Sequence, residues 1–593
     1  MSSIQTSINT IVFTLYTLAS ILSKRTCMYM NKKFLVVGGV AGGASTAARI
    51  RRLDEQAEVI MFEKGPNVSF SNCSLPFHLS GIVENSNKLV LMTPQAFQKK
   101  YNIEARVNQE VVRINRDKKT VTVNNFATGG SYEESYDVLV LSPGASPIVP
   151  NLEGIDSPHV FTVRNVVDIE RLNNYVKSDD IEDIAVIGGG FIGVEVAENL
   201  RLAGFNVSLV EFSNQIMMPF DYDMAQILHK EMLDKGVNVI VNDGLAKVTE
   251  DYVELNSGKQ VKAQAIVLAI GVRPETTLAK EAGLAIGELG GIQVDGNFVT
   301  SDPSIYAVGD AIEVFHQLTR KPTRLALAGP AQRQARAAAN HMYSMPQHNK
   351  GVIGSSSVQI FDLACASTGL NEKTALANGF QAKSVYVIAP DKVGLMPNSN
   401  PLHFKLIYEV PTGKILGAQA IGKGNADKRI DVIATLITMG GTLEDLKELE
   451  LSYSPMFSTA RDVVNLAALV AQNQLFGSYK QVNVDEVRSL VENKAYILDV
   501  RETNEYEAGH LINAVNIPLS ELRERMNEIP QDVPVYVHCR SGQRSYNAVM
   551  ALQNNGYSNV YNVSGSFLGI CLYEYFNDLT TGREKIVTEY NFK

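Results

Sequence analysis

The chain has 593 residues, of which 45% are hydrophobic and 20% are charged. That length exceeds what a single hydrophobic core supports, and the composition excludes a disordered or fibrous protein, so several globular domains are expected. The formal net charge of −9, with both signs interspersed, argues against a nucleic-acid-binding surface, which needs clustered lysine and arginine.

Five cysteines are scattered along the chain, none in a CxxC pair and none with histidine at metal-ligand spacing. They are Cys27, Cys73, Cys365, Cys539 and Cys571. This usage is typical of a reducing cytoplasm, where a cysteine matters through its reactivity and not through cross-linking. We therefore expect a cytoplasmic protein with no metal site.

Residues 1–29 precede the first segment that reads as folded. Residues 8–22 are apolar, but no basic residues precede them, no clear cleavage site follows, and the run is shorter than the about 20 residues that span a bilayer. We expect a disordered extension or a start codon placed too early. The alternative is a weak membrane anchor.

The first folded segment has the order strand, glycine turn and helix. A buried-strand run at 34–37 leads through the turn 38–43 into a small-residue helix at 44–53, and the next strand, 58–62, ends at Glu63. In dinucleotide sites such a turn lets the backbone approach pyrophosphate, and a carboxylate after the second strand holds a ribose hydroxyl. Val40 replaces the second glycine of the strict pattern. The expected contacts are Gly38, Gly39, Ala41, Gly42, Gly43, Glu63 and Lys64.

A second copy of the same pattern follows, now with strict glycine spacing. A strand at 184–187 enters the turn 188–193, a helix is expected over 194–203, and a strand at 206–210 ends at Glu211. The expected contacts are Gly188, Gly190, Phe191, Ile192, Gly193 and Glu211. Two fingerprints imply two dinucleotides. Because the Glu211 carboxylate should repel a 2′-phosphate, NADH is favoured as the second nucleotide, with NADPH possible.

Further strands end in glycine turns and make a family resemblance specific. Residues 136–141 run into Gly144, residues 304–308 run into Gly309 and Asp310, and residues 266–273, which contain Gly271, read as one returning strand. From residue 33 to about 470 the chain resembles the two-dinucleotide flavoprotein disulfide reductases. The resemblance implies that the first unit binds FAD, that the inserted unit binds NAD(P)H, and that Asp310 holds the ribityl chain of the flavin.

The reaction class is indicated by the segment SFSNCSLPF at 69–77, in which Cys73 has no second cysteine nearby. A lone thiolate needs an external disulfide partner, or it rests as a sulfenic acid or persulfide. The segment resembles the motif of the coenzyme A-disulfide reductases, whose cysteine forms a mixed disulfide with CoA. The resemblance implies CoA contacts at Ser45, Arg49, Arg52, Ser69, Asn72, Gln332 and Arg461. Arg49 and Arg52 share a helix face, so they can meet phosphates together.

Residues 351–455 resemble the dimerisation domain of the same family, which implies a homodimer. Tyr453 matches a tyrosine that reaches across the dimer toward the flavin and cysteine of the other subunit, and we count it with Cys73 as catalytic. Two departures concern the substrate. The chain has Leu395 and Met396 where the family has two tyrosines, and Tyr101 where some members have a lysine.

Residues 482–576 resemble a single rhodanese domain. The strand and loop VYVHCRSGQRS at 535–545 would surround the Cys539 sulfur with backbone N–H groups and a helix N-terminus, which stabilise a thiolate or persulfide. Arg540 and Arg544 would bind an anionic sulfur donor. Asp499 and Arg501 are interpreted as residues that hold the fold. Phosphatase chemistry is the alternative, although it uses a longer pattern around cysteine and arginine.

The predicted fold class is α/β, with two nested Rossmann-like domains, an α+β dimerisation domain and a rhodanese domain. The predicted boundaries are 30–148 with 281–345 for the FAD domain, 149–280 for the NAD(P) domain, 346–472 for the dimerisation domain and 478–593 for the rhodanese domain. The predicted function is NAD(P)H-dependent, FAD-dependent reduction of CoA disulfide, CoA persulfide or polysulfide. The alternatives are an NADH oxidase or peroxidase of the same superfamily and a non-catalytic redox or sulfur sensor.

Overall fold

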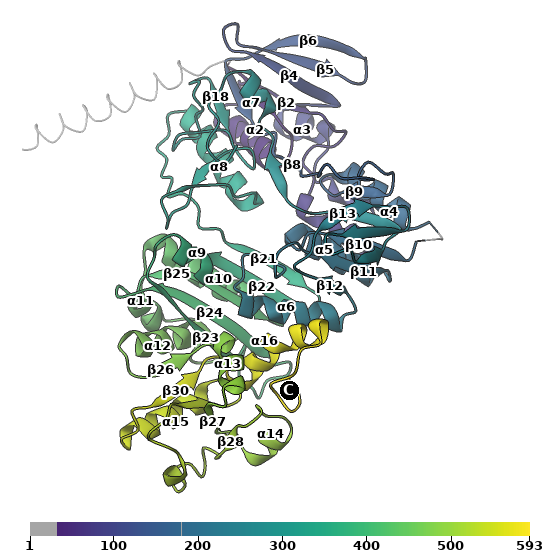
Figure 1. The fold of residues 1–593 in the computed structure, drawn as a ribbon. Coiled ribbons are helices and arrows are strands. Elements are labelled where there is room, and N and C mark those ends of the chain that lie inside the picture. Colours follow the sequence, from purple (N-terminus) through teal and green to yellow (C-terminus); the bar gives the residue numbers. More distant parts are fainter. Residues whose placement is uncertain (1–31, 179–180, 593) are drawn as a thin grey trace, which may run out of the picture.

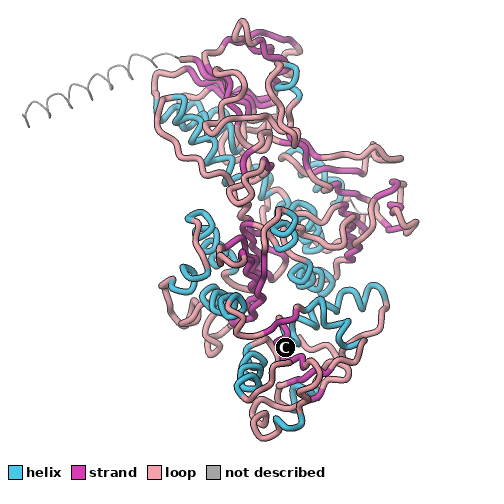
Figure 2. Tube along the Cα trace, turned by 60° about the vertical axis from the view of Figure 1, so that its left-hand side comes forward, coloured by secondary structure: helices cyan, strands magenta, loops and turns pink. Residues whose placement is uncertain are grey.

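The computed structural model describes residues 32–178 and 181–592 (Figure 1). The extension 1–29, and Cys27 with it, lies outside the described residues. Within the described part, no helix combines the length and the apolar character needed to cross a bilayer. The first nucleotide-binding domain and the rhodanese domain lie at opposite ends of the molecule, as the rotated view of Figure 2 also shows.

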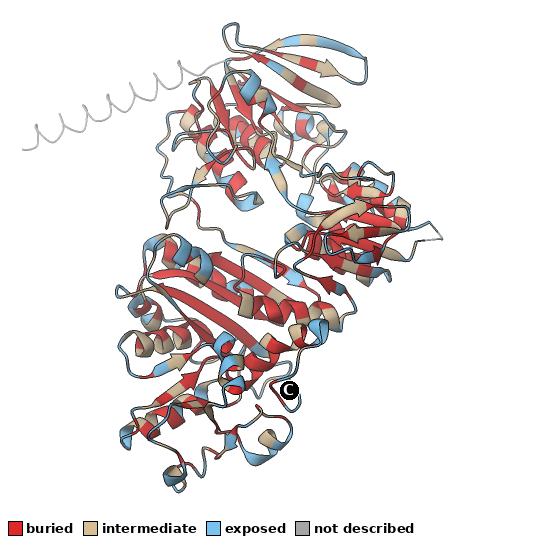
Figure 3. Cartoon of the chain, viewed as in Figure 1, coloured by how far each residue is buried: buried red, intermediate tan, exposed pale blue. Residues whose placement is uncertain are grey.

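The first nucleotide-binding domain is built on a five-stranded sheet in the order β18-β7-β1-β2-β3, in which all neighbours are parallel. Its strands are β1 (Lys33–Val37), β2 (Glu58–Glu63), β3 (Glu104–Val107), β7 (Val138–Leu141) and β18 (Ile305–Ala307). Helices α2 (Ala41–Leu53) and α8 (Ala328–Met342) cover it, with α3 (Pro94–Tyr101) and α7 (Thr277–Glu281) at its margins. The strands are apolar throughout because a parallel sheet is buried on both faces (Figure 3). An antiparallel sheet of β4 (Gln109–Asn115), β5 (Thr120–Asn125) and β6 (Gly130–Ser135) projects from this domain.

The second nucleotide-binding domain is inserted into the first through two crossing segments, β8 (Ala145–Pro147) and β17 (Val272–Pro274), which pair antiparallel. Its parallel sheet has the order β12-β11-β10-β16-β9. The strands are β9 (Val160–Thr162), β10 (Asp183–Ile187), β11 (Asn206–Val210), β12 (Asn238–Ile240) and β16 (Ala265–Leu268). The helices are α4 (Val166–Val176), α5 (Phe191–Leu202) and α6 (Tyr222–Asp234), and a small sheet holds β13 (Leu245–Val248), β14 (Tyr252–Leu255) and β15 (Gln260–Lys262).

Two local predictions were wrong. Residues 266–273 do not form one strand, because Gly271 takes a φ of +113° and separates β16 from β17, which belong to different sheets. Helices α2 and α5 begin three residues before the predicted starts. The second half of each glycine turn is already helical, so its N–H groups belong to the helix N-terminus.

The dimerisation domain is an antiparallel sheet in the order β21-β22-β25-β24-β23, with helices packed on it. Its strands are β21 (Ser356–Ile360), β22 (Leu363–Gly369), β23 (Ala382–Pro390), β24 (Pro401–Glu409) and β25 (Ile415–Gly422). Its helices are α9 (Glu372–Ala377), α10 (Ala426–Met439), α11 (Leu443–Glu448) and α12 (Val463–Leu475). The core of this domain lies between the sheet and α10 and α12.

The rhodanese domain has a parallel sheet in the order β26-β30-β29-β27-β28. Its strands are β26 (Lys480–Val482), β27 (Tyr496–Asp499), β28 (Val515–Asn516), β29 (Val535–His538) and β30 (Val560–Val563), and its helices are α13 (Val487–Glu492), α14 (Thr503–Glu507), α15 (Gln543–Asn554) and α16 (Ser566–Thr581). Leu568, Leu572 and Phe576 of α16 belong to the same apolar core as residues of α6. The rhodanese domain is therefore packed against the body of the protein.

Candidate functional site

The first glycine turn has the shape of a dinucleotide cradle. Gly38 has a φ of +99°, and a Cβ atom there would lie 2.0 Å from the carbonyl oxygen of Ser142. A Cβ atom on Gly43 would lie 1.8 Å from the carbonyl oxygen of Gly38, so only glycine lets α2 pack against the turn. The Glu63 carboxylate accepts hydrogen bonds from the N–H groups of Gly39 and Gly65, each at 3.0 Å. The carboxylate is thus fixed at the place where a ribose would lie.

Val40 is compatible with this cradle. It is the N-cap residue of α2 and has a φ of −110°. Since that φ lies outside the left-handed region, this position does not require glycine. Gly190, the corresponding residue of the second turn, also has a negative φ, at −79°.

The second glycine turn makes nearly the same contacts as the first. Gly188 has a φ of +110°, and a Cβ atom on Gly193 would again lie 1.8 Å from the carbonyl oxygen of the first glycine. The Glu211 carboxylate accepts hydrogen bonds from the N–H groups of Gly189 and Ser213, each at 2.7 Å. The residues present therefore fit two dinucleotides, one in each domain.

The turn that carries Asp310 is held by residues that belong to no motif. The Gly309 N–H donates to the side-chain oxygen of Gln334 on α8 at 2.8 Å. Burial raises the pKa of Asp310, and the positive charge of Arg164 opposes that rise. Arg164 donates to the carbonyl oxygen of Pro143 at 3.1 Å, beside Gly144, and its own carbonyl oxygen accepts from the Asn72 side chain at 3.3 Å. Arg164 thus connects three segments that were predicted to bind the flavin or the substrate.

Cys73 lies in a short 3-10 helix, η1 (Asn72–Ser74), and its side chain is accessible to solvent. Partial burial raises the pKa of the Cys73 thiol, and the carboxylates of Glu195 and Asp310 raise it further. Glu195 belongs to α5, directly after the second glycine turn, whereas Asp310 belongs to the first domain. Cys73 therefore lies where the two nucleotide-binding domains face each other.

Glu195 was not predicted as a site residue, because nothing in its motif shows that α5 packs near the Cys73 segment. Burial raises the pKa of Glu195 to about 7. A carboxyl group with such a pKa exchanges a proton near neutral pH, which is a property of general acids and bases. Ser69, predicted to contact CoA, has a φ of +48°, and its N–H donates to the carbonyl oxygen of Gly39 at 2.7 Å. That bond joins the Cys73 segment to the first cradle.

The three arginines of α2 differ in their surroundings. Arg51 is buried and donates five hydrogen bonds to main-chain carbonyl groups, three just after α2 and two at the end of α3, so its role is structural. Arg49 donates to the side-chain oxygen of Asn340 on α8 at 2.8 Å, and Arg52 makes no ion pair within the described part of the chain. Arg49 and Arg52 stay predicted CoA contacts, together with Ser45 and the exposed Gln332.

The predicted residues of the dimerisation domain lie on its surface. Tyr453 is 49% exposed and Arg461 is exposed, both in the segment between α11 and α12. Among the described residues, no hydrogen bond joins Tyr453 to Cys73 within one chain, and the contact across a dimer stays a prediction. Leu395, at the position of a family tyrosine, is 88% exposed.

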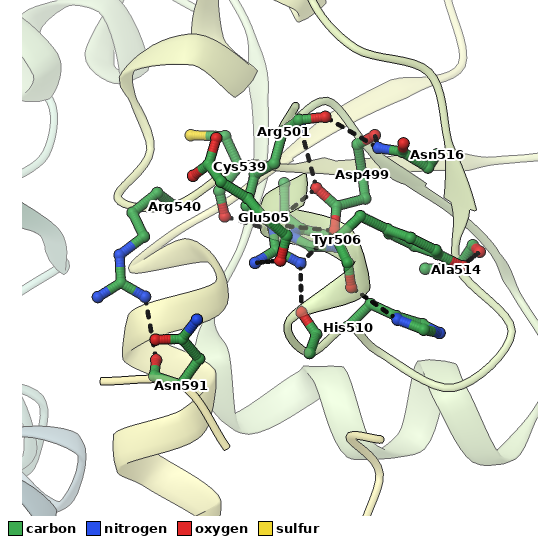
Figure 4. Close-up of polar contacts among 12 residues, drawn as sticks. Asp499, Arg501, Glu505, Tyr506, His510, Ala514, Asn516, Cys539, Arg540 and Asn591 are labelled. Atoms are coloured by element: carbon green, nitrogen blue, oxygen red, sulfur yellow. Dashed lines mark hydrogen bonds and ion pairs between the residues drawn. The ribbon is translucent and has the colours of Figure 1, made fainter. Parts of the chain in front are cut away.

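The rhodanese loop connects β29 to α15 and places Cys539 at its start (Figure 4). The Gly542 N–H donates to the Cys539 sulfur at 3.1 Å, and the Ser566 hydroxyl lies 3.9 Å from the same sulfur. A backbone donor aimed at sulfur, just before the first residue of α15, stabilises negative charge there. Behind the loop, Arg501 and Asp499 form a fully buried ion pair that ties β27 to the Gly509 carbonyl group.

Arg540 of this loop and Arg544 at the start of α15 both bind protein groups. Arg544 forms a bidentate ion pair with Glu505, at 2.6 and 2.7 Å. Arg540 donates to the carbonyl oxygen of Asn591 near the C-terminus at 3.0 Å (Figure 4). Binding of a sulfur donor by these arginines stays a prediction.

The loop also faces the dimerisation domain. Burial, and then the positive charge of Arg540, lower the pKa of His403 on β24 to about 4. His403 shares a 2.6 Å hydrogen bond with the hydroxyl of Tyr386, whose ring packs against Gly565 and Gly569 of the rhodanese domain. Cys539 is thus carried by a domain in a defined orientation.

Comparisons with known proteins agree with this architecture. Residues 32–335 match the pyridine nucleotide-disulphide oxidoreductase family, residues 355–463 match the dimerisation domain of that family, and residues 483–572 match the rhodanese-like domain. A coenzyme A disulfide reductase of Staphylococcus epidermidis is 36% identical over 444 residues, which cover 75% of this chain and 100% of that protein. The structure of reduced CoADR-RHD from Bacillus anthracis is 45% identical, with a TM-score of 0.89, over 93% of this chain and 99% of the other. An NAD-dependent persulfide reductase from A. fulgidus is 34% identical, with a TM-score of 0.86, over 90% of this chain and 99% of the other.

The chain belongs to the pyridine nucleotide-disulphide oxidoreductase family and carries a C-terminal rhodanese-like domain. It is a flavoprotein oxidoreductase that uses FAD and a nicotinamide nucleotide. The predicted fold class and the predicted reaction class are confirmed.

Proposed function

We propose that this protein reduces the sulfur–sulfur bond of CoA disulfide or CoA persulfide with NADH, through Cys73, and that Cys539 carries sulfane sulfur. The observation that carries this proposal is the position of Cys73, a lone accessible thiol whose segment hydrogen-bonds to both nucleotide-binding domains, through Ser69 to Gly39 and through Asn72 to Arg164. CoA is the thiol named for the staphylococcal relative, and persulfide is the substrate named for the archaeal one.

The Cys73 thiolate attacks the sulfur–sulfur bond of the substrate. With CoA persulfide, a Cys73–S–S–CoA disulfide forms and hydrosulfide leaves; with CoA disulfide, CoA thiolate leaves. When bound, FAD supplies the two-electron link between NADH and this mixed disulfide. The sum is NADH, a proton and CoA persulfide giving NAD⁺, CoA and hydrogen sulfide. Glu195, whose pKa is about 7, is placed to hold a proton for the leaving thiolate.

Cys539 delivers the sulfur atom in this scheme. A Cys539 persulfide is attacked by CoA thiolate, which gives CoA persulfide and returns the Cys539 thiolate. The Gly542 N–H, 3.1 Å from the sulfur, stabilises that thiolate. The presence of a domain that carries sulfane sulfur indicates CoA persulfide as the substrate in preference to CoA disulfide, because the reduction of a disulfide needs no such carrier.

Three finer properties belong to the proposal. NADH is preferred over NADPH because the fixed Glu211 carboxylate repels a 2′-phosphate. The dimerisation domain supports a homodimer in which Tyr453 serves the site of the other subunit. The four described cysteines are free thiols, which supports a cytoplasmic location.

Anaerobic stopped-flow spectroscopy of the flavin tests the proposal. NADH should reduce the flavin in Cys73→Ser, but CoA disulfide and CoA persulfide should no longer reoxidise it. Cys539→Ser is the matched control and should be reoxidised like the wild type. Reoxidation of Cys73→Ser at the wild-type rate would refute the assignment. Faster reoxidation of the wild type by oxygen or peroxide than by CoA persulfide would favour the NADH oxidase alternative.

A further inference from the structure

Cys73 lies in a segment, residues 72–89, whose two ends are tied to each other at the edge of the first nucleotide-binding domain. Phe70 pairs with Val90 in an antiparallel bridge. Two main-chain hydrogen bonds, at 2.8 and 2.9 Å, flank this bridge. Residues 72–89, which we call the Cys73 loop, therefore leave and re-enter the first domain at one place.

The apolar side chains of the Cys73 loop are buried in the core of the inserted domain. Leu75, Leu79 and Leu89 are each at most 4% exposed. They belong to the same apolar core as Leu172 of α4 and Leu200 of α5. Among the described residues, the apolar core of the first domain includes no side chain of the loop. Burial therefore holds the loop to the inserted domain, although its ends belong to the first domain.

Three side-chain hydrogen bonds also join the Cys73 loop to helices α4 and α5. The pairs are Ser80 with Asn199 at 2.6 Å, Ser86 with Glu170 at 2.6 Å, and His78 with Asn173 at 3.2 Å. Asn173 and Asn199 are at most 5% exposed, so water does not compete for their hydrogen bonds. The loop is thus attached to the inserted domain by polar contacts as well as by apolar ones.

Asn199 links the loop to the helix that begins at the second glycine turn. Its side-chain oxygen accepts from the Ser80 hydroxyl, and its side-chain amide group donates to the carbonyl oxygen of Glu195 at 2.8 Å. Both polar ends of the side chain are therefore bound, one to the loop and one to α5. A displacement of α5 is passed directly to Ser80.

We propose that the Cys73 loop moves with the inserted domain, and that Asn199 is the positioning residue that couples the two. This inference deepens the proposed function and rests on it. With FAD in the first cradle, the distance from the Cys73 sulfur to the flavin then depends on how the inserted domain sits on the first. Closure of the inserted domain on NADH places the thiol for electron transfer, in addition to placing the nicotinamide.

Native-state hydrogen exchange on the full-length flavoprotein, without substrate, tests whether the loop belongs to the inserted domain. Val59 of β2 and Val207 of β11 form a matched pair, because both are buried and each is the second residue of the equivalent strand of its sheet. Val207→Ala should raise the exchange of protected amides in the Cys73 loop and in α5 by the same factor, about tenfold, and leave β1 unchanged. Val59→Ala should raise exchange in β1 and leave the loop unchanged. Loop amides that respond to Val59→Ala, to both substitutions equally or to neither would overturn the inference.

The role of Asn199 is tested by two substitutions that break its bond to the loop. Asn199→Leu removes both of its hydrogen bonds, whereas Ser80→Ala removes only the bond to the loop and keeps the one to Glu195. In both variants NADH should reduce the flavin at the wild-type rate, whereas reoxidation by CoA disulfide should be about tenfold slower. Ser80→Ala should also speed hydrogen exchange in the loop but not in α5. Ser131→Ala, which removes an exposed hydroxyl from β6, is the matched control and should match the wild type in every measurement.

Equal slowing of both half-reactions in Asn199→Leu would show a structural role only and would overturn the assignment of Asn199, as would wild-type reoxidation in Ser80→Ala. Failure of the proposed function has a different signature. It is a wild-type flavin that NADH reduces but that neither CoA disulfide nor CoA persulfide reoxidises, and the exchange experiment with Val59→Ala and Val207→Ala does not depend on that result.

Discussion

The second glycine turn offers a sharp test of the cradle, because two of its glycines have opposite surroundings. A Cβ atom on Gly193 would lie 1.8 Å from the carbonyl oxygen of Gly188, whereas a Cβ atom on Gly190 meets no protein atom within 4 Å. Real Cβ contacts are essentially never under 3.0 Å, so Gly193→Ala must move α5 away from the turn by about 1.2 Å. Overpacking of this size costs about 1–3 kcal/mol.

Gly193→Ala should therefore lower the free energy of unfolding by about 1–3 kcal/mol, measured by denaturant titration, and should weaken NADH binding as well. Gly190→Ala should keep wild-type stability but raise the dissociation constant for NADH about tenfold, since the methyl group occupies space at the N-terminus of α5 where pyrophosphate approaches. Flavin reduction at increasing NADH concentrations gives the dissociation constant for NADH of each variant. Unchanged NADH affinity in Gly190→Ala, or equal destabilisation by both substitutions, would refute this reading of the turn.

Three further predictions concern electrostatics and domain contacts. Glu195→Gln removes a negative charge that raises the pKa of Cys73, so the rise of activity with pH, which follows thiolate formation, should move to lower pH, whereas Glu195→Asp should keep its position. Lys405→Met leaves three buried or half-buried carboxylates, those of Asp221, Asp223 and Glu372, without their cation, and should destabilise the protein by about 3–5 kcal/mol in thermal or denaturant unfolding. Gly565→Ala, at a φ of +71° and with its Cβ 2.8 Å from the Tyr386 ring, should loosen the rhodanese domain, seen as faster proteolysis between α12 and β26 while NADH still reduces the flavin; unchanged proteolysis would contradict that contact.

The two cradles could be predicted from sequence because their constraints are local. Gly38 and Gly43 are close in the chain and contact each other directly, and the same is true of Gly188 and Gly193. The strand before each turn is an uninterrupted apolar run, and the carboxylate after the second strand follows about 20 residues later. Such short-range rules are enough to give the fold class.

The remaining site residues depend on contacts between distant segments. Glu195 raises the pKa of Cys73 only because α5 of the inserted domain packs near the Cys73 segment, and Arg49 donates to Asn340 only because α8 packs beside α2. Arg164 lies in a linking segment without any motif. The engagement of Arg540 and Arg544 by Asn591 and by Glu505 also depends on tertiary structure that periodicity does not reveal.

Mass spectrometry of the Cys73 peptide from protein purified without reductant tests the central claim most directly. The account predicts that the Cys73 thiol carries CoA as a mixed disulfide, or an extra sulfur atom, and that NADH removes the adduct. Cys365, which is buried and whose pKa burial raises, should stay an unmodified thiol in the same digest. A Cys73 found only as a free thiol or as an oxygen adduct, with neither CoA nor sulfur attached after exposure to CoA persulfide, would contradict the account.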